Sequence, residues 1–167
     1  PGGHTKARPG INPLHVDVHH VVKKKDLDML MELSKNTGYE TMKAARRAVG
    51  WDKLEAVFNF YREKFVEGED YEDRRLISEE DLKRNLYNIK IAADNADFVF
   101  VYMHQHHWDP EWQKTPDWIQ DFAHKCIDAG AIAFIDHGVP MLHGIEIYKR
   151  RRSEEHTSEL QSRFDLV

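Results

Sequence analysis

The sequence predicts an α/β fold, and three observations in its second half support this. A short apolar run at residues 96–103 is typical of a buried strand and ends at His104. A helical pattern follows, and then a second apolar run, residues 131–135, ends just before His137. Parallel strands joined by a helix cross over right-handedly and end at the same edge of a sheet. We therefore expect both imidazoles at the edge where open α/β sheets bind their ligands.

Composition narrows the class of protein. The chain has 167 residues, 32% charged and 41% hydrophobic, which is typical of a soluble globular domain. No apolar run approaches the ~20 residues of a membrane-spanning helix. Its single cysteine excludes an internal disulfide framework. The formal net charge of -5, without a long basic block, makes nucleic acid an unexpected partner.

The last residues match something other than a protein. Residues 152–162 equal one translated reading frame of a common sequencing-library adapter. We interpret residues 152–167 as an adapter-derived tail without ordered structure and exclude it from fold reasoning. Residues 1–151 then form the protein's own sequence. The chain opens at Pro1 without Met, so we expect the native sequence to continue at both ends.

The first half of the chain predicts one strand and several helices. Residues 15–22 alternate between apolar and polar side chains, as a strand does. Residues 26–34, 41–49 and 52–66 carry apolar side chains at helical spacing. Residues 68–73 read as a polar linker.

His15, Asp17 and His19 share one face of the first predicted strand, because side chains alternate across a strand. Three such side chains could act together as metal ligands. The interpretation that we favour is a polar, solvent-facing edge strand, because no nearby loop supplies a further ligand.

Two helices are predicted in the second half of the chain. Ser78 and Asp81 have the spacing of a capping box and start the first. Thr115 as N-cap and Pro116 at the first helical position start the second, which Gly130 ends. The apolar stripe of this second helix comprises Trp118, Ile119, Phe122, Ala123, Cys126 and Ile127.

The histidines that follow the first apolar run form the strongest candidate site. If strand geometry persists, His104 and His106 face one way and His107 the other. A metal site would combine one or two of them with His137, because imidazole is a common ligand for zinc and iron. The alternative is a solvated histidine-rich loop. Asp136 can either orient an imidazole or serve as a strand-end turn residue.

Several segments, in order, resemble a known family. Residues 8–14 read RPGINPL, residues 96–104 read ADFVFVYMH, and residues 128–138 read DAGAIAFIDHG. They resemble the RPG-x-NPL, ADFV-x-V-x-x-H and DAGA…GHGPH motifs of the CapA-like family of capsule and poly-γ-glutamate synthesis proteins. Residues 144–148, a predicted strand, resemble the strand before that family's YSLGNF motif. The resemblance runs over residues 8–149.

The resemblance implies a calcineurin-like metallophosphoesterase fold. In that reading, residues 1–151 are the C-terminal portion of a CapA-like domain. The fold class is then α/β, a partial calcineurin-like metallophosphoesterase sandwich with the C-terminal βαβ unit and its flanking helices.

The resemblance also implies a function. His104 and His137 carry over as ligands of a divalent metal, whose site would be dinuclear in the full-length parent. His106 and His107 would be catalytic, as secondary ligands or as donors to developing charge. The parent would be a metal-dependent hydrolase in capsule or poly-γ-glutamate biosynthesis, acting in the cell envelope on a polyanionic polymer or a small molecule. Membrane association of the parent stays open.

The sequence departs from the family pattern at important positions. Asp136 stands where the family has glycine, and Pro140 stands where it has the closing histidine. The family's early Asp, Gly-Asp pair and Asn-Asn-His segment have no counterpart in this chain. The alternative function is therefore a non-catalytic polymer-binding or scaffold module of the cell envelope on a degenerate phosphoesterase fold. A third alternative is a piece of chain without a stable fold.

Overall fold

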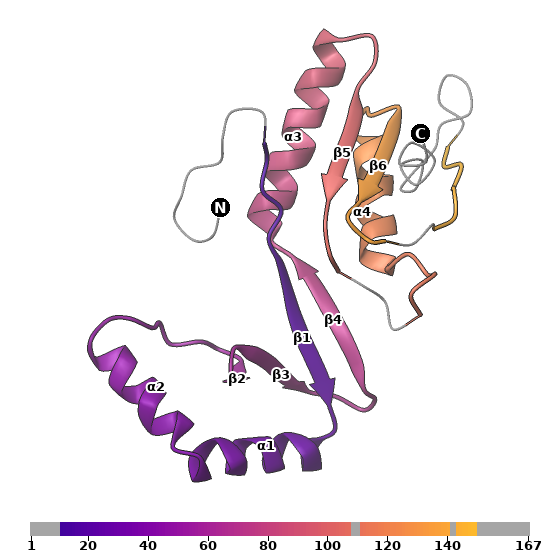
Figure 1. The fold of residues 1–167 in the computed structure, drawn as a ribbon. Helices are drawn as coiled ribbons and strands as arrows, with labels where there is room; N and C mark the ends of the chain where they lie inside the picture. The colour runs from indigo at the N-terminus through magenta and orange to yellow at the C-terminus, as the bar shows by residue number, and fades with distance from the viewer. Residues whose placement is uncertain (1–10, 108–110, 141–142, 150–167) are drawn as a thin grey trace. The chain divides into compact units, whose positions relative to one another are not determined.

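The computed structural model describes residues 11–107, 111–140 and 143–149. Residues 152–167, which we interpret as an adapter-derived tail, and the first three residues of the RPGINPL segment lie outside these residues. The chain divides into two compact units (Figure 1). One unit is His15–Ser78, and the other combines Pro1–Leu14 with Glu79–Val167.

The unit His15–Ser78 is a mixed sheet with two helices. Its elements are β1 (Val16–Val22), α1 (Lys24–Asn36), α2 (Tyr39–Ala48), β2 (Phe58–Phe60), β3 (Glu63–Glu67) and β4 (Glu72–Ile77). The strand order is β2-β3-β1-β4. β1 runs parallel to β3 and antiparallel to β4. The strand and the first two helices expected from the sequence are confirmed here as β1, α1 and α2.

The helix predicted for residues 52–66 is wrong, because residues 58–66 lie in the hairpin of β2 and β3 and residues 52–57 form neither helix nor strand. The turn residues Tyr61 and Arg62 both have positive φ, 48° and 76°. Two such residues are typical of the tight turn whose twist suits a hairpin, and Asn or Gly usually occupies it. Neither is present, so no turn signal was visible. The predicted linker at residues 68–73 was also too long, since β4 begins at Glu72.

The expected edge position of the first strand is also wrong. β1 lies between β3 and β4 and pairs along its length with β4. One of the polar side chains on this face, Asp17, pairs across the sheet. Asp17 accepts bonds from Lys64 Nζ at 2.6 and 2.8 Å. Asp17 therefore forms an ion pair, and the interpretation of His15, Asp17 and His19 as part of an edge strand is wrong.

His20 of β1 links three strands. Its Nδ1 lies 2.6 Å from Asp73 Oδ1 of β4, and its Nε2 lies 3.0 Å from Glu63 Oε2 of β3. A neutral imidazole carries only one N–H, so donating to both carboxylates needs the imidazolium. The hydrogen bond to Glu63 raises the pKa of His20, burial opposes the rise, and Asp73 adds to it.

We expect this contact to make the stability of the sheet depend on pH. Because the pKa of His20 is raised on folding, its contribution is fully present below the unfolded value of about 6.5 and is lost as pH rises through the folded value. Urea denaturation at pH 6 and pH 8 should show that His20→Gln removes part of the decline seen in the parent chain. His19→Gln, where Asp17 lies 3.6 Å away, is the control. An unchanged pH dependence in His20→Gln would contradict the expectation.

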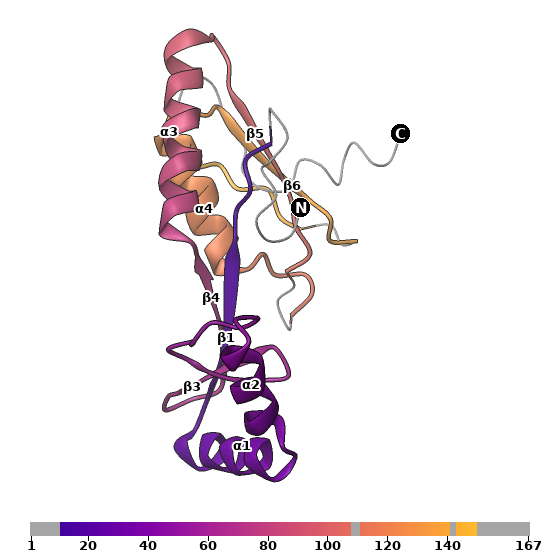
Figure 2. The same ribbon diagram turned by 90° about the vertical axis from the view of Figure 1, so that its left-hand side faces the viewer.

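The second unit is built on one βαβ element. It contains α3 (Glu79–Asn95), β5 (Phe100–His104), α4 (Asp117–Asp128) and β6 (Ala133–His137). β5 and β6 are parallel and in register, so that His104 lies opposite His137. The two helices lie on the same face of this strand pair (Figure 2). The predicted strand–helix–strand unit is therefore confirmed.

The core of this unit lies between α4 and β6. The five fully buried side chains of the helix are Ile119, Phe122, Ala123, Cys126 and Ile127. Phe134 of β6 is also fully buried and meets Phe122 edge-on, with 5.7 Å between ring centroids. Burial raises the pKa of the Cys126 thiol to about 12, so this cysteine behaves as a small apolar side chain. The predicted stripe is confirmed apart from Trp118, which is half-buried.

Three details of the prediction for this unit need correction. The run ending at His104 is not buried on both faces, because Phe100 and Tyr102 are about 60% exposed (61% and 60%). No strand spans residues 144–149, where only Ile147 forms an isolated bridge. Pro116 is itself the N-cap of α4, without a side-chain capping bond, so the helix begins one residue later than Thr115 predicted.

Residues 143–149 are anchored to α4 by side chains instead. His124 Nε2 lies 2.8 Å from Glu146 Oε1, and the Tyr148 ring stacks on the His124 ring at 3.8 Å. A strand needs backbone partners along its length, and among the described residues this segment has only the single bridge at Ile147. His124 is thus packed between α4 and this segment.

Candidate functional site

Three imidazoles form a row at the carboxyl end of the β5–β6 pair. His104 Nδ1 lies 3.1 Å from His137 Nδ1, and His104 Nε2 lies 3.0 Å from His106 Nε2. We call His106, His104 and His137 the histidine row. The Tyr102 ring continues the row, with its centroid 4.4 Å from that of His137. The structure thus brings together the two predicted metal ligands and one of the two predicted catalytic histidines.

The row arises from register and alternation. His104 and His137 end paired strands at the same level, and residues two apart on a strand face one way. This places His106 beside His104 even though β5 has ended. The helices cover the opposite face, so the rings of His104 and His106 are exposed. The sequence correctly predicted that neighbouring strands would bring these rings together.

The proton count of the row fits neutral histidines. Each of the two nitrogen–nitrogen contacts needs one N–H, and three neutral imidazoles carry three. Whichever tautomers are present, His104 uses both of its ring nitrogens, one toward His137 and one toward His106. Each gap can hold one shared proton or, in its place, one metal ion.

The spacing suits a pair of metal ligands. Two imidazole nitrogens on one tetrahedral zinc ion, each about 2.0–2.1 Å from it, are about 3.3 Å apart. The gaps of 3.1 and 3.0 Å lie close to that value. The three rings do not converge on one point, however, and the described residues contain no group of three or more ligating side chains. The row therefore fits as part of a metal site, whose remaining ligands would come from elsewhere.

His107 lies apart from the row, as alternation predicted. Its ring meets the Trp118 ring of α4 edge-on, with centroids 5.4 Å apart. A ring packed on the helix side is poorly placed to act with His104. The catalytic role expected for His107 stays a prediction, and His106 is the better placed of the two.

Gln105 and Asp136 form a buried polar pair beside the row. They are 7% and 8% exposed, and Gln105 Nε2 donates to Asp136 Oδ2 at 2.8 Å. Burial raises the pKa of Asp136 to about 6, which the hydrogen bonds from Gln105 and the His137 backbone oppose. Asp136 Oδ1 has no hydrogen-bond partner among the described residues. Asp136 thus accepts a hydrogen bond from Gln105 and lies within β6. The sequence predicted instead that it would orient an imidazole or lie in a turn after the strand.

Sequence reasoning missed Gln105. Glutamine is not a residue type that indicates a metal ligand, and the hydrogen-bond partner of Gln105 lies 31 positions away in the sequence. The one available signal was alternation: a residue between two exposed histidines faces the opposite side, which here is the buried one.

The other candidate positions are not members of the histidine row. His143 Nε2 donates to the Trp112 carbonyl at 3.0 Å. Pro140 is exposed and supplies no ligand. His15, Asp17 and His19 belong to the other unit.

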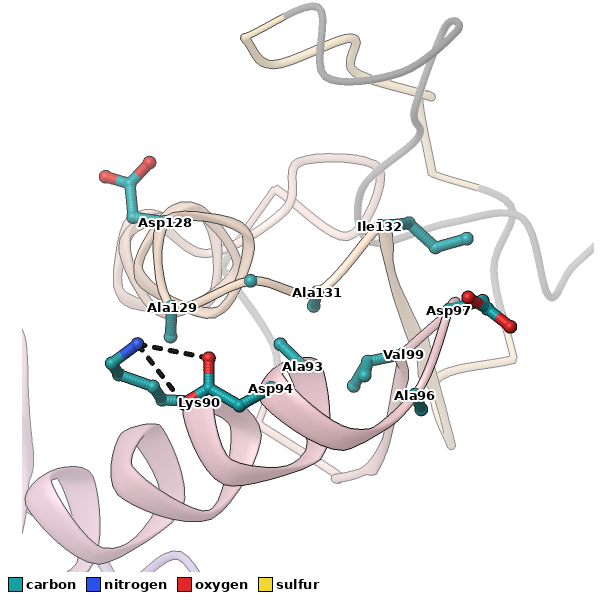
Figure 3. Close-up of a pocket in the computed structure, with 11 residues that line it drawn as sticks. Lys90, Ala93, Asp94, Ala96, Asp97, Val99, Asp128, Ala129, Ala131 and Ile132 are labelled. Atoms are coloured by element: carbon teal, nitrogen blue, oxygen red, sulfur yellow. Dashed lines mark hydrogen bonds and ion pairs between the residues drawn. The ribbon is translucent and has the colours of Figure 1, made fainter.

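A pocket of about 660 Å³ lies at the opposite end of the same strands (Figure 3). Val99 and Ile132, which precede β5 and β6, line it together with Lys90 and Asp94 of α3. Lys90 Nζ pairs with Asp94 Oδ1 at 3.4 Å, and Asp97 and Asp128 add two further carboxylates to the lining. The histidine row thus lies at the carboxyl end of the strands and this pocket at the amino end.

Fold and site together define an α/β protein that gathers imidazoles at the carboxyl edge of a parallel strand pair. The comparison with protein families is more specific: the chain belongs to the bacterial capsule synthesis protein family PGA_cap, whose profile matches residues 18–153. This family is metallophosphoesterase-like. The CapA-like resemblance is thereby confirmed.

Two curated relatives come from Sinorhizobium fredii, the uncharacterized proteins y4sH and y4uA. Each is 33% identical to this chain over 153 residues, which is 90% of this chain. The chain spans only 31% of the length of each. None of the helices within the described ranges is long and apolar enough to cross a membrane.

Proposed function

We propose that the chain supplies two ligands, His104 and His137, to the divalent-metal site of a hydrolase that acts in capsule or poly-γ-glutamate synthesis. One observation carries the proposal: the Nδ1 atoms of these residues lie 3.1 Å apart at the carboxyl ends of paired parallel strands. Membership of the capsule synthesis family supports the setting. The fold would then be the C-terminal part of a calcineurin-like sandwich.

The positions of the three histidines suit them to different roles. His104 and His137 hold the ion. A divalent ion bound there supplies positive charge that polarises a phosphoryl or acyl oxygen and acidifies water. His106 adjoins His104 and is exposed, so it can donate a proton to a leaving group or to developing charge. Carboxylates outside this chain would complete a dinuclear site. The substrate would be a polyanionic polymer or a small molecule of the cell envelope.

We expect weak zinc binding by the chain alone. A four-ligand structural zinc site contributes about 10–16 kcal/mol, so two ligands should give roughly half. That corresponds to a Kd on the order of 1–200 μM. Titration calorimetry with Zn²⁺ should find weak binding, which His104→Ala should abolish, because His104 belongs to both gaps, and which His137→Ala should weaken.

The matched control is His19→Ala, which removes a histidine from the other unit and should leave the affinity unchanged. Equal zinc binding by His104→Ala and the parent chain would refute the proposed site. Tight binding, with a Kd well below 1 μM, would also contradict it, because it would require a complete ligand set within this chain.

The second candidate is a non-catalytic polymer-binding or scaffold module. The absence of a three-ligand group among the described residues and the proline at position 140 favour it. The full-length gene discriminates between the two functions. Intact upstream Asp, Gly-Asp and Asn-Asn-His motifs, with phosphoesterase or amide hydrolase activity that depends on metal, would favour the enzyme. Their loss would favour the binding module.

A further inference from the structure

Gln105 is a buried residue between two of the histidines of the candidate site. It lies between His104 and His106, whose rings are exposed, while its own side chain is buried. Its backbone N–H donates to the His137 carbonyl at 2.9 Å and so extends the pairing of the two strands beyond the end of β5. The backbone of one residue therefore joins the two histidine-bearing segments.

Both ends of the Gln105 side chain are also bonded. Nε2 donates to Asp136 Oδ2 at 2.8 Å, and Oε1 accepts the backbone N–H of His107 at 2.5 Å. A buried amide that satisfies a partner on each side restricts both segments. The space is also tight, since a Cβ added to Gly138 would come within 2.2 Å of the Gln105 carbonyl oxygen. The segments that carry the histidine row are thus held from the buried side.

We infer that Gln105 is the positioning residue of the site, holding the imidazoles of His104 and His137 at metal-binding distance. The inference rests on the proposed function. The Cα atoms that carry two exposed side chains at strand ends keep a constant separation only where the two backbone segments are held together. A site whose ligands must stay within about 0.5 Å of their productive positions needs such support from neighbouring residues. Gln105 supplies it without touching metal or substrate.

Variants that break or exchange the hydrogen bond between Gln105 and Asp136 distinguish a positioning role for Gln105 from a merely structural one. Gln105→Met keeps the length of the side chain and loses both hydrogen bonds. Gln105→Glu places a second carboxylate against Asp136. The double variant Gln105→Glu/Asp136→Asn exchanges amide and carboxylate and restores both bonds, because the new amide donates to the new carboxylate, which still accepts the His107 N–H. Gln113→Met, at an exposed glutamine, is the control.

The experiment is a Zn²⁺ titration of the full 167-residue chain at pH 7.5, followed through the imidazole ring resonances. Loss of a residue that supports metal ligands typically weakens metal binding ten- to a hundredfold. We expect that loss for Gln105→Met and for Gln105→Glu. The double variant should recover most of the affinity, and Gln113→Met should match the parent chain. Methyl resonances of Ile119 and Ile127 report in parallel whether the core stays folded.

A second readout needs no metal. The nuclear Overhauser effect between the ring protons of His104 and His137 should be present in the parent chain, weaken in Gln105→Met and return in the double variant. If the parent chain binds no zinc, the proposed function fails, but this readout still decides the role of Gln105. Should Gln105→Met not fold, the comparison of Gln105→Glu with the double variant decides it. Parent-like affinity and ring contacts in a folded Gln105→Met or Gln105→Glu would overturn the inference.

Discussion

Truncation of Phe134 to alanine is expected to lower the free energy of unfolding of the βαβ unit by about 3–5 kcal/mol. Phe134 is fully buried and packs against Phe122 of α4. Removing its ring loses the transfer free energy of the side chain and leaves a cavity, which the close-packed helix can fill only in part. Urea denaturation, followed through resonances of this unit, measures the change.

Phe100→Ala is the matched control, because it removes the same ring from the neighbouring strand. Phe100 is 61% exposed on the face that the helices leave open, so its loss should change the free energy by no more than about 0.5 kcal/mol. Comparable losses at both positions would mean that the open face of the strand pair is covered in solution. The two variants together thus test which side of the sheet carries the core.

The contrast between these strands also shows what the sequence could predict. The pairing of β5 with β6 followed from two apolar runs joined by a helix, because the handedness of such crossovers leaves one arrangement. The exposure of Phe100 and Tyr102 did not follow. An aromatic run has the same composition whether one face of its strand is covered or two, and only the placement of α3 and α4 decides it.

The β2–β3 hairpin is a second feature that the sequence could not predict. The apolar side chains of this segment recur at helical spacing, at Leu54, Val57, Phe58, Tyr61 and Phe65. Phe58 and Phe60, however, are two residues apart, as neighbours on one face of a strand are. Both periods fit so short a segment, and the usual turn residues that would have decided between them are missing. Pairing of β3 with the distant β1 settles the conformation, and local sequence carries no record of that contact.

For the candidate site, the sequence predicted which residues meet and not how they meet. Strand ends and alternation were enough to place His104, His106 and His137 together. That His104 contacts a different partner through each ring nitrogen depends on side-chain rotation, which spacing does not determine. The buried pair of Gln105 and Asp136 was equally out of reach, because it joins residues that are distant in sequence and of unremarkable type.

Gly138→Ala is expected to disturb both the site and the fold of its unit. Gly138 has a φ of 115°, in the region that favours glycine, and a Cβ would lie 2.2 Å from the Gln105 carbonyl oxygen and 3.1 Å from His104 Cε1. Backbone cannot yield as a flexible side chain does. We expect a loss of about 2–4 kcal/mol in the free energy of unfolding, the sum of positive-φ strain and displacement of the strand end.

Gly38→Ala separates the two contributions. Gly38 also has positive φ, 74°, but a Cβ there would meet nothing within 4 Å. Its loss should therefore be the strain alone, about 1–2 kcal/mol, measured through resonances of its own unit. The difference between the two losses in the free energy of unfolding measures how tightly residues 104–107 and 136–138 are packed together.

Zinc binding by Gly138→Ala should fall along with its stability, because the added methyl group would push the Gln105 backbone and the His104 ring away from β6. A Gly138→Ala chain with the affinity of the parent and a loss no larger than that of Gly38→Ala would mean that these segments are loosely held, and that the histidine row owes its geometry to something other than its backbone.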